Sequence, residues 1–254
     1  MKPYHFAGII PARYASKRFP GKPLAIIGNK TMVQRVYEQV SETCDIVFVA
    51  TDDTRIHDEV LRFGGNVVMT STEHSSGTDR CAEATDRIME KTGNSIDIII
   101  NIQCDEPFIK PEQINLLKSC FDDPDVEIAT LVRKTTPGED VFNPNHPKVI
   151  LDSKENAIYF SRSVIPFIRD YEQSEWSEKH SFYKHVGLYA YRYHILKKIT
   201  LLPVSYLEIS ESLEQNRWIE NGFKIRTAIT DHAGTGIDTP DDLQRILDHP
   251  EQFL

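Results

Sequence analysis

The first half of the chain alternates short apolar runs with amphipathic stretches, and this alternation constrains the fold more than any other feature. Four apolar runs have the length of buried strands: 6–11, 46–50, 66–70 and 97–102. Helical periodicity follows each of them, over 31–40, 53–63, 79–91 and from Pro111 onward. Strands and helices in this order predict an α/β fold with a parallel sheet and right-handed crossovers.

The sequence also predicts the N-terminus of the first helix and the buried face of the second. Thr31 is expected to cap the first helix, with Gln34 three residues later in a capping box. In the second helix, Ile56, Val60 and Leu61 are expected to point toward the core. Both helices should therefore pack against the sheet.

The second half of the chain is less regular. Strands are predicted at 128–133, 148–151, 158–161, 186–191 and 224–230, and helices at 206–220 and 240–247. The polar and aromatic segment 169–183 is predicted to be a mobile loop. We interpret 1–254 as one domain with an inserted antiparallel lobe at about 135–200, because single cores grow to about 250–300 residues.

The charges are unevenly distributed along the chain. Overall, 29 Lys and Arg side chains oppose 38 Asp and Glu, a formal net charge of −9 at pH 7. Seven bases precede the first acid, Glu38: Lys2, Arg13, Lys17, Arg18, Lys22, Lys30 and Arg35. The acidic remainder argues against nucleic acid or an anionic membrane as a partner, because like charges repel. A small anion near the N-terminal bases fits better.

The cysteines and the apolar stretches indicate a cytoplasmic protein. Cys44, Cys81, Cys104 and Cys120 are widely spaced and form no CxxC pair, so we expect reduced thiols without a disulfide or zinc site. The apolar stretches are too short to cross a bilayer. We therefore expect neither membrane insertion nor a signal peptide.

The segment IPARYASKRFPGKP, residues 10–23, places four cations directly after a predicted buried strand. At the carboxyl end of a parallel strand, backbone N–H groups with Arg and Lys can cradle a polyphosphate. The alternative is a solubilising surface loop, and the spacing matches neither a P-loop nor GxGxxG. The residues alone leave both interpretations open.

The segment SSGTDR, residues 75–80, also follows a predicted strand. Its small residues would let a base or ribose approach the backbone. Capping of the next helix by Ser76 or Thr78 explains the same residues without a ligand, and on the residues alone we favour capping.

The segment NIQCDEP, residues 101–107, ends the predicted central strand. Asp105 lies where a carboxylate commonly holds Mg²⁺ on a nucleotide phosphate, and Gln103 is placed to bond a base. Asp238 is either a second ligand or part of the N-cap region of the last helix. Sequence spacing does not choose between these two roles.

Nine segments occur in the order found in one enzyme family: IIPARYASKRFPGKPL, ATDD, SGTDR, NIQCDEP, FNPNHPKVILD, YFSRSVIP, KHVGLYAYR, LEISESLEQNR and GIDTPDDL. Over essentially its whole length the chain resembles the 3-deoxy-manno-octulosonate (Kdo) cytidylyltransferases of lipopolysaccharide biosynthesis. The first segment alone indicates only cytidylyltransferases acting on sugar acids, whereas YFSRSVIP, KHVGLYAYR and LEISESLEQNR indicate Kdo. The resemblance implies a Rossmann-like nucleotidyltransferase fold, a smaller dimerisation lobe and a homodimer.

The resemblance also implies a reaction and its residues. CTP and Kdo would give CMP-Kdo and pyrophosphate in a Mg²⁺-dependent enzyme, with Arg13, Lys22 and Asp105 as catalytic residues and Asp105 and Asp238 as metal ligands. The implied nucleotide site comprises Ala12, Arg13, Arg18, Lys22, Ser76, Gly77, Thr78 and Gln103. The implied sugar-acid pocket comprises Arg162, His185, Tyr189, Glu214 and Gln215.

One residue departs from the family pattern Gln-Gly-Asp-Glu-Pro, because Cys104 replaces the glycine. A cysteine would be strained there if the backbone required a positive φ or a close ligand approach. A thiol beside a metal ligand also raises the hypothesis of an oxidation-sensitive enzyme.

Two alternatives stay open at this point. The same chemistry on 8-amino-Kdo or a nonulosonate would need only a few different pocket side chains. A non-catalytic nucleotide-binding module would keep the fold without the reaction. The pair Asp105 and Asp238, together with the cationic loop, argues against such a module.

Overall fold

The computed structural model describes residues 4–16 and 18–249, so Lys2 and Lys17 lie outside the described residues. The chain divides into two compact units. Unit 1 comprises Met1–Asn115, Ala190–Thr200 and Gly234–Leu254, and unit 2 comprises Leu116–Tyr189 and Leu201–Ala233. The bounds of unit 2 differ from those of the predicted lobe at 135–200, and the dimerisation role of that lobe stays a prediction.

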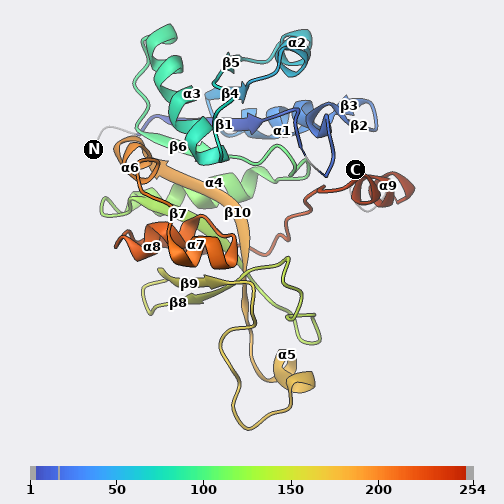
Figure 1. The fold of residues 1–254 in the computed structure, drawn as a ribbon, viewed down its shortest axis with the longest axis vertical. Helices are drawn as coiled ribbons and strands as arrows, with labels where there is room; N and C mark the ends of the chain where they lie inside the picture. The colour runs from blue at the N-terminus through green and yellow to red at the C-terminus, as the bar shows by residue number, and fades with distance from the viewer. Residues whose placement is uncertain (1–3, 17, 250–254) are drawn as a thin grey trace. The chain divides into compact units, whose positions relative to one another are not determined.

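Four strands of unit 1 form a parallel sheet in the order β6–β1–β4–β5 (Figure 1). They are β1 (Phe6–Ala12), β4 (Ile46–Thr51), β5 (Val67–Met69) and β6 (Ile98–Asn101). On β1, Ile9 pairs with Phe48 of β4 on one side and with Asn101 of β6 on the other. The predicted α/β fold with a parallel sheet is confirmed.

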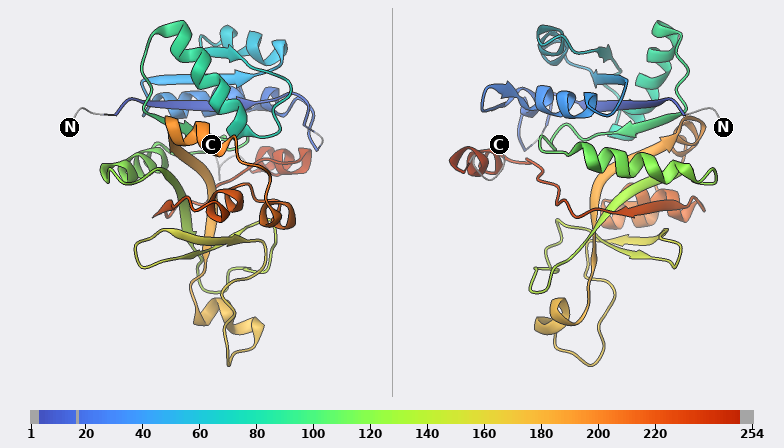
Figure 2. Two further views of the ribbon diagram at one scale, coloured as in Figure 1. Left: turned by 60° about the vertical axis from the view of Figure 1, so that its left-hand side comes forward. Right: turned by 180° about the vertical axis from the view of Figure 1, so that it is seen from behind.

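Helices cover both faces of this sheet (Figure 2). The helices of unit 1 are α1 (Met32–Ser41), α2 (Thr54–Arg62), α3 (Gly77–Thr92), α6 (Tyr193–Ile199) and α9 (Pro240–Asp248). The chain moves outward from β1 through α1 and α2 and returns to β6 through α3, so right-handed crossovers place α3 opposite α1. The strand order therefore reverses between β1 and β6, where a ligand crevice is expected at the carboxyl ends.

Several shorter elements complete the chain. They are η1 (Lys22–Leu24), the hairpin β2 (Ile26–Ile27) and β3 (Lys30–Thr31), α4 (Pro111–Ser119), which crosses from unit 1 into unit 2, and η2 (Cys120–Asp122). Over the described residues, no helix is long and apolar enough to cross a membrane.

The predicted N-cap of α1 is confirmed, but the capping box is not, because the Gln34 side chain donates to Glu38 Oε1 at 3.0 Å. One predicted core side chain of α2 also points outward. The Oγ1 of Thr31 accepts the backbone N–H of Gln34 at 3.4 Å. Ile56 and Val60 are fully buried, whereas Leu61 is 56% exposed, so its predicted inward orientation is wrong. Ile56 and Val60 share one helix face at a spacing of four, and the next residue is turned by about 100° away from it.

Unit 2 combines parallel and antiparallel pairing. Its strands are β7 (Ile128–Lys134), β8 (Lys148–Leu151), β9 (Ala157–Ser161), β10 (Tyr183–Arg192), which ends in unit 1, and β11 (Ile225–Ile229). β7 and β11 are parallel, and β8 is antiparallel to both β9 and β10. All five strands predicted in the second half are therefore present.

The helix predicted at 206–220 is wrong as a single element. The structure has α7 (Tyr206–Glu211) and α8 (Gln215–Glu220) instead. Ser212 separates them with φ +50° and ψ 47°, a left-handed conformation that ends a helix. The apolar periodicity continues across this break and conceals it.

The loop predicted at 169–183 is wrong over 173–179, where η3 (Gln173–Glu175) and α5 (Trp176–Lys179) form. Trp176 is only 3% exposed and packs with Val141 and Phe182. Its Nε1 donates to the carbonyl oxygen of Tyr171 at 3.0 Å. Burial of one large aromatic ring with its polar tip satisfied outweighs the polar composition of the segment.

Glu139 of unit 2 is held by two cations. Its carboxylate pairs with Arg133 and accepts a hydrogen bond from Lys184 Nζ at 2.7 Å. Burial opposes the charged form, but the bonds from Arg133 and Lys184 outweigh it and lower the pKa of Glu139 to about 2. Because this pKa lies below the ordinary value of 4.5, the interaction stabilises the fold above pH 4.5 and is lost as the pH falls toward 2.

We expect Glu139→Gln to lower the free energy of unfolding by about 2 kcal/mol at pH 7, since both cations lose their anion. The difference from wild type should shrink as the pH falls below 4.5. Urea unfolding at pH 7, 4 and 3 measures it, with the exposed Glu90→Gln as a charge-matched control. A difference that is equal at pH 7 and pH 3 would contradict the ionic origin of this stabilisation.

Candidate functional site

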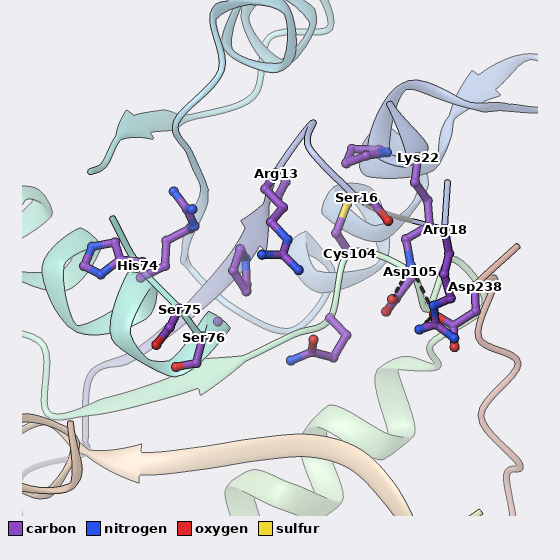
Figure 3. Close-up of a pocket in the computed structure, with 16 residues that line it drawn as sticks. Arg13, Ser16, Arg18, Lys22, His74, Ser75, Ser76, Cys104, Asp105 and Asp238 are labelled. Atoms are coloured by element: carbon purple, nitrogen blue, oxygen red, sulfur yellow. Dashed lines mark hydrogen bonds and ion pairs between the residues drawn. The ribbon is translucent and has the colours of Figure 1, made fainter. Parts of the chain in front are cut away.

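A pocket of about 450 Å³ lies in unit 1 at the carboxyl ends of β1 and β6, where the strand order reverses (Figure 3). Its volume is in the usual range for a small-molecule site. The lining residues are Pro11, Ala12, Arg13, Ser16, Arg18, Lys22, Pro23, His74, Ser75, Ser76, Gly77, Arg80, Gln103, Cys104, Asp105 and Asp238. The pocket thus combines the cationic loop with the strand-end carboxylate that the sequence indicated.

The loop after β1 is closed by its own backbone. The carbonyl oxygen of Tyr14 accepts the N–H groups of Ser16 and Gly21, each at 2.9 Å. Gly21 has φ +73°, and a Cβ there would lie 3.1 Å from the Tyr14 ring, so glycine suits this turn. The turn begins η1 and directs Lys22 into the pocket, where its side chain is 13% exposed.

Two carboxylates converge on Lys22. Its Nζ donates to Asp105 Oδ2 at 2.5 Å and to Asp238 Oδ1 at 3.4 Å, and Arg18 Nη2 donates to the same Asp238 oxygen at 2.9 Å (Figure 3). The backbone brings the acids together, because the N–H of Ile237 donates to the carbonyl oxygen of Asp105 at 2.9 Å. Two segments far apart in the chain therefore form one charged cluster.

Asp238 does not cap the last helix. The N-cap of α9 is Thr239, which forms a capping box with Asp242. The side chain of Asp238 instead contacts Arg18 and Lys22. The carboxylate of Asp238 therefore lines the pocket with Asp105.

The donor set of Asp105 and Asp238 fits a hard divalent cation. Mg²⁺ prefers oxygen ligands and commonly takes one or two carboxylates together with substrate phosphates. Carboxylates that meet at one ammonium group can also meet at a metal ion. Within residues 4–16 and 18–249, no three His, Cys, Asp or Glu side chains gather to hold a metal, so the pair would need ligands from the substrate.

Glu106 supports the segment that carries Asp238. The N–H of Thr235 donates to its carboxylate. A Cβ on Gly234 or Gly236 would lie 3.1 or 3.2 Å from Glu106 Oε1, so glycines allow this close packing. Burial, with the neighbouring negative charges, raises the pKa of Glu106 to about 7.

The start of α3 contributes to the pocket and is also capped. Ser76 Oγ accepts the N–H of Asp79 at 3.1 Å, which confirms the capping role favoured from the residues. Ser76 and Gly77 nevertheless line the pocket, so capping does not exclude ligand contact. Thr78 is 3% exposed and is not among the described residues that line the pocket.

Arg80 and His74 line the pocket but were not singled out from the sequence. Arg80 is 3% exposed, and its guanidinium donates to Asp52 Oδ2 at 2.7 Å and to Thr70 Oγ1 at 2.6 Å. His74 Nε2 pairs with Glu83. Arg80 could have been found from its spacing of three residues from Gly77, because this spacing places both residues on one face of the helix.

The residues predicted for the sugar acid all lie in unit 2: Arg162, His185, Tyr189, Glu214 and Gln215. His185 Nε2 is 3.0 Å from Thr130 Oγ1, and its ring packs against Tyr189 with centroids 5.2 Å apart. Tyr189 in turn packs against Trp218 of α8 at 5.2 Å. Burial lowers the pKa of His185 to about 3, so this ring is neutral at pH 7.

Arg162 follows β9 directly and is held by carbonyl groups. Its guanidinium donates to the carbonyl oxygens of Glu211 at 2.6 Å, Pro144 at 2.9 Å and Ser212 at 3.3 Å. In the part of the chain that the structure describes, no carboxylate forms an ion pair with Arg162. Its positive charge can therefore serve an anionic ligand.

Comparison with known proteins identifies the family. The family model described as Cytidylyltransferase matches residues 7–225. A 3-deoxy-manno-octulosonate cytidylyltransferase of Parabacteroides distasonis is 57% identical over 246 residues, 95% of this chain and 96% of that protein. The chain belongs to the 3-deoxy-manno-octulosonate cytidylyltransferase family.

Two further similarities extend over nearly the whole chain. A family member from Bacteroides thetaiotaomicron is 56% identical over 252 residues, 98% of each protein. The solved structure of a CMP:2-keto-3-deoxy-manno-octonic acid synthetase, complexed with CTP, superposes with a TM-score of 0.87 at 41% identity. It covers 98% of this chain and 99% of that one, which confirms the nucleotidyltransferase fold.

Cys104 occupies the position where the family resemblance implies glycine. The structure does not place it among the residues with positive φ, so the position does not require a backbone conformation that would strain a cysteine. The side chain is 7% exposed at the pocket wall. Burial raises the pKa of the Cys104 thiol far above its ordinary value and so disfavours the reactive thiolate.

We expect the enzyme to keep its activity after peroxide treatment, with or without reductant, contrary to the hypothesis of oxidation sensitivity. Alkylation of Cys104 at pH 8 should be at least about 10-fold slower in the folded protein than in urea, because little thiolate forms. Mass spectrometry of a quenched time course measures both rates. Activity that peroxide removes and a thiol restores would contradict this expectation.

Proposed function

We propose that this protein transfers CMP from CTP to the anomeric C2 hydroxyl of Kdo, giving CMP-Kdo and pyrophosphate for lipopolysaccharide biosynthesis. One observation carries the proposal. Three cations and two carboxylates, Arg13, Arg18, Lys22, Asp105 and Asp238, line one pocket at the switch point of the sheet. A triphosphate with its divalent cation is the ligand that this combination of charges suits.

The reaction is a displacement at phosphorus. The C2 hydroxyl oxygen bonds to the α-phosphorus, and the bond from that phosphorus to the oxygen shared with the β-phosphorus breaks. Pyrophosphate leaves with the electron pair of that bond, and the hydroxyl proton passes to solvent water. The protein contributes positioning and neutralisation of charge. We assign Arg13, Arg18 and Lys22 to the triphosphate, with the forked guanidinium groups suited to paired phosphate oxygens.

We assign Mg²⁺ to Asp105 and Asp238. Bound there, the ion would neutralise charge on the phosphate oxygens and stabilise the leaving pyrophosphate. Lys22 supplies a further positive charge beside both carboxylates. Arg18 keeps Asp238 oriented through its own hydrogen bond.

The remaining predicted residues are assigned to the base, the ribose and the sugar acid. Ala12, Ser76, Gly77 and Gln103 line the pocket beside the cations and would contact cytosine and ribose, and Thr78 would support them from its buried position. Arg162, whose guanidinium donates to three carbonyl oxygens and forms no ion pair within the described residues, is assigned to the sugar carboxylate. The neutral ring of His185 suits a hydroxyl group better than a carboxylate. We assign Tyr189, Glu214 and Gln215 to the same sugar-acid pocket.

A pyrophosphate-release assay with CTP, Mg²⁺ and a panel of sugar acids tests the proposal. Kdo should give the highest kcat/KM, ahead of 8-amino-Kdo and a nonulosonate. Turnover of another acid without turnover of Kdo would overturn the substrate assignment. CTP binding without turnover of any acid would indicate the non-catalytic module instead.

We further propose that the protein is a cytoplasmic homodimer. Among the apolar side chains of unit 2 that are more than half exposed, four lie close together in the sequence and would suit a contact surface: Leu201, Val204, Tyr206 and Ile209. The free cysteines suit a reducing compartment. A solution mass near that of one 29.1 kDa chain at micromolar concentration would contradict the dimer.

A further inference from the structure

Glu211, the last residue of α7, is bonded to the end of β9. Its carboxylate accepts hydrogen bonds from Ser161 Oγ at 2.6 Å, from Tyr159 Oη at 3.0 Å and from the backbone N–H of Arg162 at 2.8 Å. Burial disfavours its charge, but these bonds outweigh burial and lower the pKa of Glu211. A charged carboxylate with these donors is a strong anchor between α7 and β9.

The same residue holds the side chain of Arg162. The carbonyl oxygen of Glu211 accepts a hydrogen bond from Arg162 Nε at 2.6 Å. On the other side, the fully buried Lys148 donates through Nζ to the carbonyl oxygen of Arg162 at 2.9 Å. The backbone N–H, the carbonyl and the guanidinium of Arg162 are therefore all fixed, two of them by Glu211.

Glu211 also begins the turn that leads to the other sugar-acid residues. The left-handed Ser212 follows it, and Arg162 Nη2 donates to the Ser212 carbonyl oxygen at 3.3 Å. Glu214 and Gln215 come next, at the start of α8. One residue thus fixes both Arg162 and the helix break that precedes Glu214.

The attachment of α8 to β9 does not depend on Glu211 alone. Asn216 is fully buried, and its Nδ2 donates to the carbonyl oxygen of Phe160 at 3.0 Å. A change at Glu211 should therefore loosen Arg162 without detaching α8.

We propose that Glu211 is a positioning residue for the sugar acid, which acts by holding Arg162 where the substrate carboxylate binds. This inference rests on the proposed function. The carboxylate of Glu211 is already bonded to donors of the protein, so Glu211 acts through Arg162 and not by contact with the substrate. This adds a residue that the proposed function does not include. If the guanidinium of Arg162 is mobile, it must become ordered when Kdo binds, and the entropy lost in that ordering weakens binding.

Glu211→Gln tests this role, since glutamine keeps the shape but loses the charge and one acceptor. We expect KM for Kdo to rise about 10-fold, in line with the loss of charge-assisted hydrogen bonds. KM for CTP should change less than about 2-fold, because the cationic pocket of unit 1 is untouched. Glu220→Gln, the same charge change at an exposed position of α8, is the control and should leave both KM values unchanged.

A double-mutant cycle separates positioning from general destabilisation. If Glu211 acts through Arg162, then adding Glu211→Gln to Arg162→Ala should raise KM for Kdo no further. Additive effects, equal rises in both KM values, or an unchanged KM for Kdo in a folded Glu211→Gln would each overturn the inference. Failure of the proposed function is distinguishable, because the wild-type protein would then not turn over Kdo at all.

Ser161→Ala provides a second variant if Glu211→Gln does not fold. It removes one donor to Glu211 and leaves the carboxylate in place. We expect a smaller rise in KM for Kdo, about 3-fold, with KM for CTP unchanged. No rise in this folded variant would likewise overturn the inference.

Discussion

Replacing Asp105 with alanine is expected to lower kcat by about 10³-fold or more while the fold is retained, because the pocket loses a preorganised charge at the reacting phosphate. Asp105 contacts Lys22 and lies beside the segment that carries Asp238, so its loss removes one of the two assigned metal ligands. Its side chain is 31% exposed, so truncation leaves no large buried cavity. Initial rates of pyrophosphate release at saturating CTP and Kdo measure the effect.

Two further variants show that charge at this position is the cause. Asp105→Asn keeps the shape and should lose nearly as much activity, since a neutral amide is a poor ligand for Mg²⁺. Asp45→Ala, at an exposed position, should retain wild-type activity. Circular dichroism checks the fold of each. Survival of activity in Asp105→Ala would show that the metal assignment is wrong.

Replacing Arg80 with alanine is expected to lower the free energy of unfolding by about 3 kcal/mol, because the partly buried Asp52 carboxylate loses its buried partner. Arg80 Nη2 is 2.7 Å from Asp52 Oδ2, and the two side chains are 4% and 16% exposed. Arg80 also donates to Thr70 Oγ1 and to the carbonyl oxygen of Ser71. It therefore ties the chain after β4 to the chain after β5 beneath the pocket wall.

Arg87→Ala on the same helix is the matched control. Arg87 pairs with Glu83 at 2.5 Å, but its side chain is 50% exposed. An exposed pair of this kind contributes only about 0.5 kcal/mol. Urea unfolding of both variants compares the two pairs directly, and equal losses would contradict the role of burial.

The sheet of unit 1 could be predicted because its signals are local. β1 is a short apolar run between polar segments, and Thr31 occupies a favourable capping position. A β2–β3 hairpin was also available from the sequence, since Gly28-Asn29 separates two paired dipeptides and Gly28 has φ +67°. These features depend on residues within one turn or strand of each other.

The break between α7 and α8 and the formation of α5 could not be predicted, because both depend on contacts between residues far apart in the sequence. The break at Ser212 follows a residue, Glu211, whose carboxylate is bonded to β9 about 50 positions earlier in the chain. Trp176 orders α5 by packing against Val141 and Phe182. Such tertiary contacts override the composition and periodicity of a short segment.

The candidate site, like the fold, could be predicted only in part. Residue chemistry alone left the loop of Arg13 and Lys22 open between an anion site and a surface loop, and it placed Asp105 at the end of a buried strand, where a metal-binding carboxylate is common. It left the role of Asp238 open. In the structure, the backbone bond from Ile237 to Asp105 and the bonds from Arg18 and Lys22 bring Asp238 to the pocket. The assignment of Arg162 came from family resemblance, while the structure supplies the carbonyl groups that hold it.

The most direct measurement of cytidylyl transfer is ³¹P NMR of the protein with CTP, Kdo and Mg²⁺. The three CTP resonances should decay while one phosphodiester resonance of CMP-Kdo and the singlet of pyrophosphate grow in equal amounts. Omission of Kdo should leave CTP intact. Formation of CMP or CDP without a phosphodiester, or an unchanged CTP spectrum in the complete mixture, would contradict the proposed transfer.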